Sequence, residues 1–247
     1  MIKGFALTDI GLKRKINQDS VFFTAEKTGS YPNLAVLADG MGGYKAGEYA
    51  SAFTVDYIVD YMKKSRCGSA VALKNAITTC NTLINRKACR EKEFDRMGST
   101  VVAAVIEDGL ITVANVGDSR LYVIRDEMHQ ITRDHSLVEE MILKGEMTRD
   151  SEEYRKNKKY LTRAVGAEKN IVTDFFDEEL EDGDYVLLCS DGLTNMVTEE
   201  QIFGIVKGNG SLEEKASALV DSANKNGGSD NIAVILISYV KGGDENV

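Results

Sequence analysis

Short apolar runs and amphipathic stretches occupy separate blocks of the chain. Runs of roughly four to eight apolar or alternating residues are typical of strands. By this criterion we expect strands at 3–9, 20–25, 33–39, 99–107, 110–116, 120–125, 171–176, 185–189 and 232–240. Asp108-Gly109 is a hairpin signal, so we expect the whole segment 99–132 to form an antiparallel meander.

Helical periodicity occurs between these blocks, with apolar residues recurring every three or four positions. A helix over 45–64 is expected to bury Ala46, Ala50, Phe53, Tyr57 and Tyr61. A second helix, beginning near Ser69, is expected to bury Leu73, Ile77, Cys80 and Ile84.

Three shorter helices follow. One is expected at 137–143, and two more begin at capping boxes, in which a Ser or Thr side chain caps the helix start and a Glu or Gln three residues later caps in return. The pairs are Thr198 with Gln201 and Ser211 with Glu214. Runs of strands separated by runs of helices indicate an α+β protein with layered antiparallel sheets. Because the chain has no internal repeat and no linker, we expect one domain over residues 1–247.

The segment 144–159 is almost wholly polar and has no periodic apolar face. A long polar insertion inside a compact domain is usually a surface flap or a binding lobe. A mobile surface loop and a flap beside a site are both compatible with this sequence.

Composition narrows the class of protein. Lys+Arg is 30 and Asp+Glu is 39, so the net charge is 30 − 39 = −9, which argues against a general nucleic-acid binder. The same charge is compatible with cation binding or with ordinary solubility. The chain has no cationic-then-apolar leader and no apolar stretch of about 20 residues, and its four cysteines form no C-x-x-C pair. We therefore expect a cytoplasmic protein with reduced thiols that does not enter a membrane.

Four aspartates stand at the ends of apolar strand segments, each beside glycine or one residue from it. They are Asp39, Asp118, Asp191 and Asp230. Any one of them alone is more simply a turn residue, since Asp and Gly dominate turns. If the four strand ends meet at one end of a sandwich, the aspartates form an oxygen-only cluster that suits Mg²⁺ or Mn²⁺. Neither His129 nor His135 has a partner at zinc-ligand spacing.

Seven short motifs, running from residue 14 to 231, resemble the metal-dependent type 2C protein serine/threonine phosphatases in order and spacing. They are Arg14-x-x-Asn17-Gln18-Asp19, Asp39-Gly40-Met41-Gly42-Gly43 with Gly47-Glu48 beyond it, Gly98-Ser99-Thr100, Gly117-Asp118-Ser119-Arg120, Asp134-His135-Ser136, Ser190-Asp191-Gly192-Leu193 and Gly228-Ser229-Asp230-Asn231. The chain looks like a compact bacterial member of this family.

The resemblance implies a central antiparallel β-sandwich flanked by pairs of α-helices, in α-β-β-α layers, with a flap insertion at about 144–165. It also implies a hydrolase with two Mn²⁺ or Mg²⁺ ions and, as in bacterial relatives, a third. Asp39 would bridge the first two ions, with the Gly40 carbonyl on one of them. Asp191 and Asp230 would complete that pair.

Three further roles follow from the resemblance. Asp19 would hold a metal through water, and Asp118, together with Asp191, would hold the third ion. Arg14 would bind the substrate phosphate. Its planar guanidinium suits a phosphate because it donates two parallel hydrogen bonds, although taken alone Arg14 would be a surface charge between Lys13 and Lys15. Two metals offset the charge of a phosphate monoester and activate a water for its hydrolysis.

Four positions depart from parts of the family. Met41 stands where many eukaryotic members have a histidine that is a proposed general acid, which leaves that role open. Gln18 replaces a glutamate, Tyr44 stands where bacterial relatives often carry histidine, and Ala233 stands where threonine is common. None of these changes removes a carboxylate ligand. We expect Cys189 to be a packing residue, and His135 to cap a helix or satisfy a core hydrogen bond instead of acting as a base.

These observations favour a phosphoserine/phosphothreonine phosphatase in signal transduction. Its partners would be phosphoproteins and a cognate serine/threonine kinase, and we expect a monomer. Two alternatives remain: a non-catalytic phosphoprotein-binding module, and a two-metal hydrolase of small phosphoesters or nucleic acid. The intact aspartates argue against the first, and the acidic charge argues against nucleic acid as a substrate.

Overall fold

Two antiparallel sheets form the centre of the molecule. The computed structural model describes residues 1–43, 45–149, 151–158 and 160–241. The first sheet has the order β1 (Ile2–Asp9), β11 (Ile232–Tyr239), β10 (Tyr185–Cys189), β7 (Arg120–Ile124) and β8 (Met128–Gln130). The second has the order β2 (Asp19–Thr24), β3 (Leu34–Met41), β5 (Val101–Glu107), β6 (Leu110–Val116) and β9 (Asp174–Glu179), and β4 (Gly98–Ser99) pairs with β3.

Strand β3 shows how the sheets bury both faces. Successive side chains of a strand point to opposite sides. Ala35 and Leu37 pack between the two sheets, against residues such as Leu188 and Ile235. Val36 and Ala38 belong to the apolar cluster that the outer helices cover. The strand is therefore apolar along its whole length up to Asp39.

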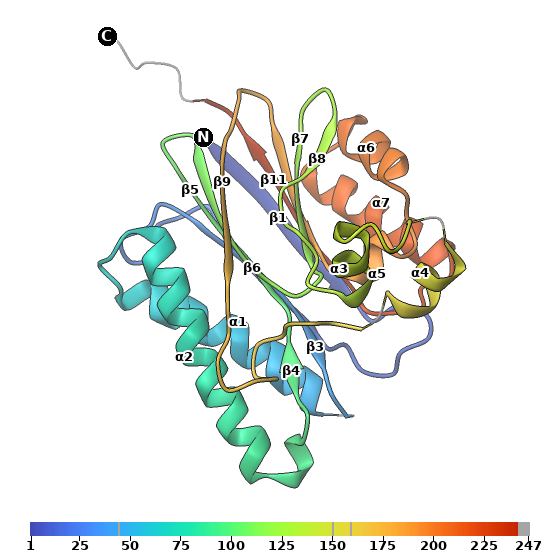
Figure 1. Ribbon diagram of the computed structural model, residues 1–247. Coiled ribbons are helices and arrows are strands. Elements are labelled where there is room, and N and C mark those ends of the chain that lie inside the picture. The colour runs from blue at the N-terminus through green and yellow to red at the C-terminus, as the bar shows by residue number, and fades with distance from the viewer. Residues whose placement is uncertain (44, 150, 159, 242–247) are drawn as a thin grey trace.

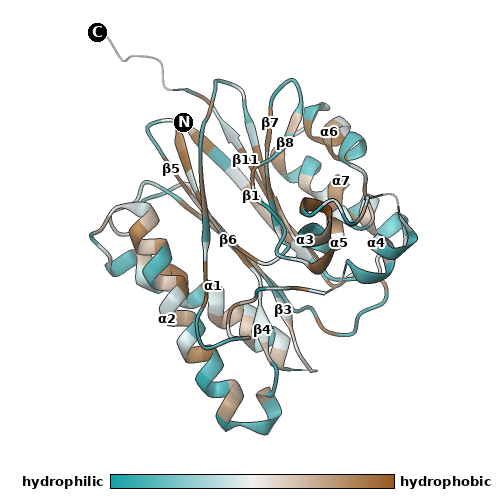
Figure 2. Cartoon of the chain, viewed as in Figure 1, coloured by the Kyte–Doolittle hydropathy of each residue, from teal (hydrophilic) through white to brown (hydrophobic). Residues whose placement is uncertain are grey.

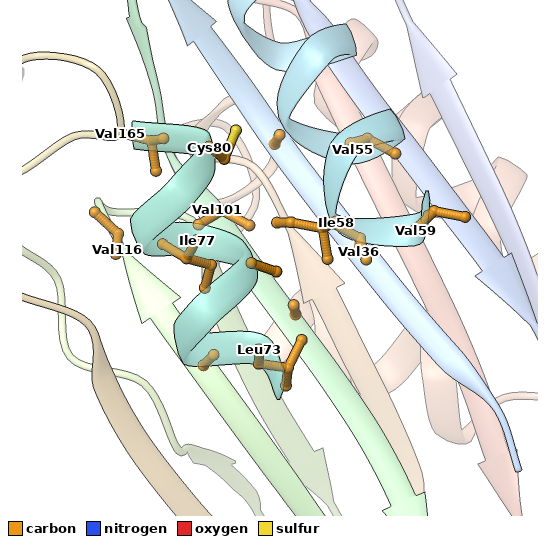
Figure 3. Packing of buried hydrophobic residues seen from close by; sticks show 14 of the residues in the cluster. Val36, Val55, Ile58, Val59, Leu73, Ile77, Cys80, Val101, Val116 and Val165 are labelled. Carbon is orange, nitrogen blue, oxygen red and sulfur yellow. The ribbon is translucent and has the colours of Figure 1, made fainter. Parts of the chain in front are cut away.

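Helices α1 (Ala46–Lys64) and α2 (Ser69–Arg90) form the layer outside the second sheet (Figure 1). Ile58 of α1 and Ile77 of α2 meet Val36 and Val101 of the sheet (Figure 3). The stripe expected for α2, which includes Ile77, is fully buried.

The stripe expected for α1 was partly wrong. Its fully buried line runs through Thr54, Ile58 and Met62. Phe53 and the tyrosines at 57 and 61 are only partly buried, and their rings contact one another along the helix edge. Narrower side chains bring α1 close to the sheet, and the wide rings cover the margin of the contact.

Helices α6 (Glu199–Lys207) and α7 (Leu212–Lys225) cover the first sheet, with the short α5 (Asp191–Thr194) beside them (Figure 1). Both expected capping boxes are formed, with Thr198 and Ser211 as the capping residues. The layers are therefore α-β-β-α, as expected. In Figure 2 hydrophobic colour is concentrated on the strands between the helix layers.

The expected meander over 99–132 was wrong at one step: its two hairpins form, but β6 and β7 lie in different sheets. Strands β5 and β6 pair through the Asp108-Gly109 turn, but β6 continues to β9 in the same sheet. Strand β7 pairs with β10 and β8 in the other sheet. The chain crosses between sheets at 117–119, where Gly117 has φ of +108°.

The polar insertion is more ordered than expected. After α3 (Leu137–Leu143), Ser151 caps a short, hydrophilic helix α4 (Glu152–Asn157) (Figure 2). The returning chain is bonded to the body: the N–H of Thr162 donates to the His135 carbonyl (2.8 Å), and Val165 and Ser99 exchange two backbone hydrogen bonds (2.8 and 2.9 Å).

Some expectations fall outside the described residues. They concern Tyr44, which stands where bacterial relatives often carry histidine, and positions 150 and 159 of the insertion.

A further short helix, η1 (Lys92–Phe94), follows α2. In the described ranges, no helix has the length and apolar character required to cross a membrane.

Candidate metal centre

The ends of five strands meet at one end of the sandwich and bring the predicted aspartates together. In the second sheet, Asp19 at the start of β2 is directly opposite Asp39 near the end of β3, and Asp118 follows β6. From the first sheet, Asp191 follows β10, and Asp230 precedes β11. Segments separated by up to 211 positions, 230 − 19, thus converge.

A cavity of about 570 Å³ opens at this end. Six of the seven predicted site residues line it: Arg14, Asp39, Gly40, Asp118, Asp191 and Asp230. The seventh, Asp19, lies deeper, with only 6% of its surface exposed. The sequence motifs therefore describe one place in the structure.

The backbone around Asp39 is fixed by its neighbours. Its N–H donates to Thr100 Oγ1 (2.9 Å), and its carbonyl accepts from the Thr100 N–H (2.8 Å) and from Ser99 Oγ (3.0 Å). Both peptide groups of Asp39 are thus satisfied by the Gly98-Ser99-Thr100 motif, and its carboxylate remains available to the cavity.

Gly40 permits a close approach of α1 to the end of β3. A Cβ at this position would lie 2.0 Å from the Gly47 carbonyl oxygen, so no side chain fits. The Gly40 N–H donates to the Gln18 carbonyl (2.9 Å), which connects β3 to the segment before β2. The glycine turn is therefore required by packing, whatever else it binds.

Asp19 has one satisfied and one unsatisfied carboxylate oxygen. Ser190 Oγ donates to Asp19 Oδ2 (2.7 Å) and accepts from the Ala233 N–H (2.9 Å). Asp19 Oδ1 is buried, and no donor in the described ranges reaches it. A buried acceptor without a donor is costly, and a cation or a bound water would satisfy it.

The carboxylates carry more negative charge than their surroundings compensate. Burial, and then the charges of Asp191 and Asp230, raise the pKa of Asp19 to about 7. Burial and nearby carboxylates also raise the pKa of Asp191 to about 6 and place the pKa of Asp39 and Asp118 well above the usual carboxyl value. Burial and like charge both disfavour the ionised form.

Two polar partners restrain members of the cluster. Arg14 forms an ion pair with Asp230, with Nη2 at 2.7 Å from Oδ2 and both side chains partly exposed. Asn195, which follows α5 and lies four residues after Asp191, donates from Nδ2 to Asp191 Oδ2 (2.8 Å). Lys158 of the insertion in turn donates to Asn195 Oδ1 (2.7 Å), so the insertion is connected to Asp191.

The donor set fits a hard divalent cation. Its charged groups are carboxylates, burial and then neighbouring carboxylates raise their pKa values, and no donor in the described ranges reaches Asp19 Oδ1. Oxygen ligands of this kind suit Mg²⁺ and Mn²⁺. As the side chains are placed, no three Asp, Glu, His or Cys residues in the described part of the chain form a ready-made ligand set. Mutual repulsion and the Asp230–Arg14 pair oppose such an arrangement.

His135 has the geometry of a core hydrogen-bonding residue. Its Nδ1 accepts from the Gly117 N–H (3.1 Å), and its Nε2 lies 3.1 Å from Asp174 Oδ2. Burial lowers its pKa below the usual 6.5. It lies outside the cavity lining, and the cap of α3 is Ser136, so His135 holds the backbone of Gly117, the residue before Asp118.

Several lining residues were not assigned a role from the sequence. Thr100 and Asn231 lay within recognised motifs, but their hydrogen-bond partners are distant in sequence. Arg163 and its neighbours 160–164 line the cavity from the returning end of the insertion. The contact between Asn195 and Asp191 could have been predicted from the sequence, because residues four positions apart lie on one face of a helical turn.

The departures from the family pattern also have defined places. Met41 lines the cavity with a thioether and therefore supplies no acid. Gln18 lines the cavity beside it. Ala233 is buried in β11, where its N–H contacts Ser190.

A four-layer sandwich with carboxylates at one end of its two sheets is the arrangement that the resemblance to metal-dependent phosphatases implies. The sequence profile of protein phosphatase 2C matches residues 13–236. The serine/threonine phosphatase stp of Listeria innocua is 38% identical over 238 residues, which cover 93% of each chain. The chain belongs to the protein phosphatase 2C family.

Solved structures are similar over nearly the whole chain. The serine/threonine phosphatase Stp1 from Staphylococcus aureus has a TM-score of 0.89 at 32% identity, covering 97% of this chain and 95% of that one. The catalytic domain of the serine/threonine protein phosphatase PstP, in complex with two manganese ions, has a TM-score of 0.83 at 31% identity, covering 97% and 98%.

Metal binding should stabilise the fold through Asp39. In a large excess over its Kd, Mn²⁺ should raise the thermal midpoint of wild-type protein by roughly 5–10 °C relative to EDTA. Asp39→Asn should be at least as stable as wild type in EDTA, since it removes a buried charge, but should gain little from Mn²⁺. Differential scanning calorimetry measures both effects.

The matched control is Asp56→Asn, which alters an exposed carboxylate on α1. This variant should keep the full Mn²⁺ shift. An equal shift in wild type and Asp39→Asn would exclude Asp39 as a ligand.

Proposed function

We propose that the protein hydrolyses phosphoserine and phosphothreonine monoesters in other proteins. The observation that carries this proposal is that the guanidinium of Arg14 and the carboxylates of Asp39, Asp191 and Asp230 line one cavity. A phosphate dianion needs positive charge to bind, and carboxylates alone would repel it. Arginine with cation-holding aspartates provides that charge. The serine/threonine phosphatases among the relatives support the same substrate class.

The metal assignment extends this proposal. Two Mn²⁺ or Mg²⁺ ions would be held by Asp39 between them, by the Gly40 carbonyl, and by Asp191 and Asp230. Asp19 would act through water, and Asp118 with Asp191 would hold a third ion. Bound metals of this kind offset phosphate charge and lower the pKa of water, which makes hydroxide available near neutral pH. The similar PstP structure with two manganese ions supports the count of two.

The protein groups have separate tasks. Arg14 binds and orients the phosphate, because its fork matches two phosphate oxygens. Asp19, held by Ser190, and Asp191, held by Asn195, keep fixed orientations through these hydrogen bonds. Met41 donates no proton to the leaving serine or threonine oxygen, so that proton would come from water or from another group in the cavity.

Cys189 is unsuited to be a covalent nucleophile. It is fully buried, and burial raises the pKa of its thiol to about 12. A cysteine nucleophile reacts as the thiolate. Cys189 instead packs with Leu187 and Leu193 in the core beneath α5, and hydrolysis would proceed without a covalent phosphoenzyme.

The insertion at 144–165 would serve as a flap of a single domain spanning 1–247. Its returning residues 160–164 line the cavity, and its Lys158 is connected through Asn195 to Asp191. The same segment would thus contact the substrate and help to orient Asp191.

The proposed setting is that of a signalling enzyme in the cytoplasm. It would act as a monomer and oppose a serine/threonine kinase. Phosphoproteins would be its partners, and the net charge of −9 argues against nucleic acid and anionic membrane surfaces.

Turnover of two substrates tests the proposal. With Mn²⁺, wild-type protein should release phosphate from a phosphothreonine peptide and from p-nitrophenyl phosphate, and EDTA should abolish both reactions. Asp39→Asn should lose activity by a factor of 10² or more, on the order of the effect of removing one electrostatic group from an active site. Hydrolysis of p-nitrophenyl phosphate alone would favour a small-phosphoester hydrolase, and peptide binding without turnover would favour a binding module.

Arg14 should bind the phosphate through both its positive charge and its planar guanidinium. We expect Arg14→Gln to lower kcat/KM for the phosphothreonine peptide by roughly 10- to 100-fold, the size of one charge-assisted contact. Arg14→Lys should fall between wild type and Arg14→Gln because lysine keeps the charge but lacks the fork. Arg90→Gln, at the exposed end of α2, is the control and should match wild type. Wild-type kinetics in Arg14→Gln would remove Arg14 from phosphate binding.

A further inference from the structure

A basic loop, residues 10–18, joins β1 to β2 at the edge of the catalytic cavity. Its middle carries Lys13, Arg14 and Lys15 in succession. Arg14 is assigned to the substrate phosphate, and the two flanking lysines have no role in the proposed reaction. The surroundings of these lysines indicate a role in binding the substrate.

A single side chain fixes both ends of the basic loop. Asn231 Nδ2 donates to the carbonyls of Ile10 (2.9 Å) and Ile16 (3.0 Å), and Asn231 Oδ1 accepts from the Gln18 N–H (2.9 Å). Between those points, the N–H groups of Leu12 and Lys13 both donate to the Gly228 carbonyl (2.8 and 3.1 Å).

Close packing holds the loop against the segment that carries Asp230. Gly11 has φ of +75°, and a Cβ there would lie 2.1 Å from the Asp230 carbonyl oxygen. The backbone that presents the lysines is therefore ordered beside the catalytic cavity. Their ammonium groups move on their own side chains, but the positions from which they extend are fixed.

A second hollow, of about 300 Å³, is built on this loop. It is lined by Lys13, Arg14, Lys15, Ile16, Gln18 and Gly42. Arg14, Gln18 and Gly42 also line the catalytic cavity, so the two hollows meet at these residues. A substrate whose phosphate lies against Arg14 can extend directly into the second hollow.

The second hollow is positively charged although the chain as a whole is acidic. Neither Lys13 nor Lys15 forms an ion pair within the described ranges, and both side chains are exposed. No Asp or Glu lines this hollow. Its lining therefore offers two positive charges to an incoming anion at little cost in desolvation.

We propose that this hollow is a subsite for a second anionic group of the substrate, on a residue that flanks the phosphorylated serine or threonine. The proposal rests on the proposed function. The ligand is an anionic side chain of the same peptide, either a carboxylate or a second phosphate. Consecutive Cα atoms are about 3.8 Å apart, so an anion within one to three residues of the phosphorylated position can reach the adjoining hollow. Lys13 and Lys15 would thus determine substrate specificity.

Four phosphothreonine peptides test the subsite. One has neutral flanks, one has Glu on the N-terminal side, one has Glu on the C-terminal side, and one has a second phosphothreonine. With Mn²⁺, wild type should prefer at least one anionic peptide over the neutral peptide by roughly fivefold in kcat/KM, mainly through KM, as two partly exposed ion pairs would give. The preference should fall as salt rises from 50 to 500 mM, because salt screens exposed charges.

The double variant Lys13→Gln/Lys15→Gln should bring the anionic peptides to the kcat/KM of the neutral one. The matched control, Lys74→Gln/Lys92→Gln, changes net charge equally on the exposed surface of α2 and η1 and should keep the preference. Which peptide is preferred distinguishes a carboxylate from a second phosphate and gives the direction of the chain. Equal kcat/KM for all peptides in wild type, or equal loss of preference in the control, would overturn the proposal.

A binding measurement separates this proposal from the proposed function. Fluorescently labelled versions of the four peptides are titrated with wild type and both double variants, and affinity is read from anisotropy. If no peptide is hydrolysed, the proposed function fails. The subsite then stands only if wild type still binds an anionic peptide roughly fivefold more tightly than the neutral one and Lys13→Gln/Lys15→Gln does not.

Discussion

Repulsion among closely placed carboxylates, one of them buried and four lining the cavity, is the constraint on which the site depends. Asp19 and Asp39 are paired across β2 and β3, so their separation is set by the spacing of adjacent strands and cannot relax. Asp118, Asp191 and Asp230 come from three other strand ends at the same place. Only a rigid scaffold keeps such charges together, and the two-sheet core with helices on both sides supplies it. A cation is the ligand that most directly relieves this strain.

Short polar side chains that hydrogen-bond to the backbone hold the aspartates and the basic loop in place. Thr100 and Ser99 fix the peptide groups of Asp39, Ser190 joins Asp19 to β11, and Asn231 fastens the basic loop. Each of these residues is fully or nearly fully buried, which limits the access of competing water to its hydrogen bonds. These hydrogen bonds offset the destabilisation that the clustered carboxylates cause, as is common at functional sites that hold strain.

The sequence indicated the four strand-end aspartates, Asp39, Asp118, Asp191 and Asp230, because each follows a local rule, whereas Arg14, Asp19 and Gly40 were assigned only through the family resemblance. An aspartate beside glycine after a strand can be recognised without knowing what lies across the sheet. The strand order of the sandwich depends instead on pairings between distant segments, and so the continuation of β6 to β9 was missed. The burial of α1 was misjudged because apolar character alone does not show that Thr54 faces the sheet and the aromatic rings its edge. Asn231 stood in a motif, but its three partners lie more than 210 positions away.

The adjacency of Asp230 and Asn231 links the two halves of the proposed substrate site. Asp230 is paired with Arg14, and Asn231 holds the backbone on both sides of Arg14. The charge on Asp230 and the position of the lysines on either side of Arg14 therefore depend on the same short segment before β11. Under the proposed function, a cation bound to Asp230 would weaken the Arg14–Asp230 ion pair and free Arg14 for the phosphate, while Asn231 keeps the loop in place. Charge can then be redistributed at the site without movement of the backbone that presents Lys13 and Lys15.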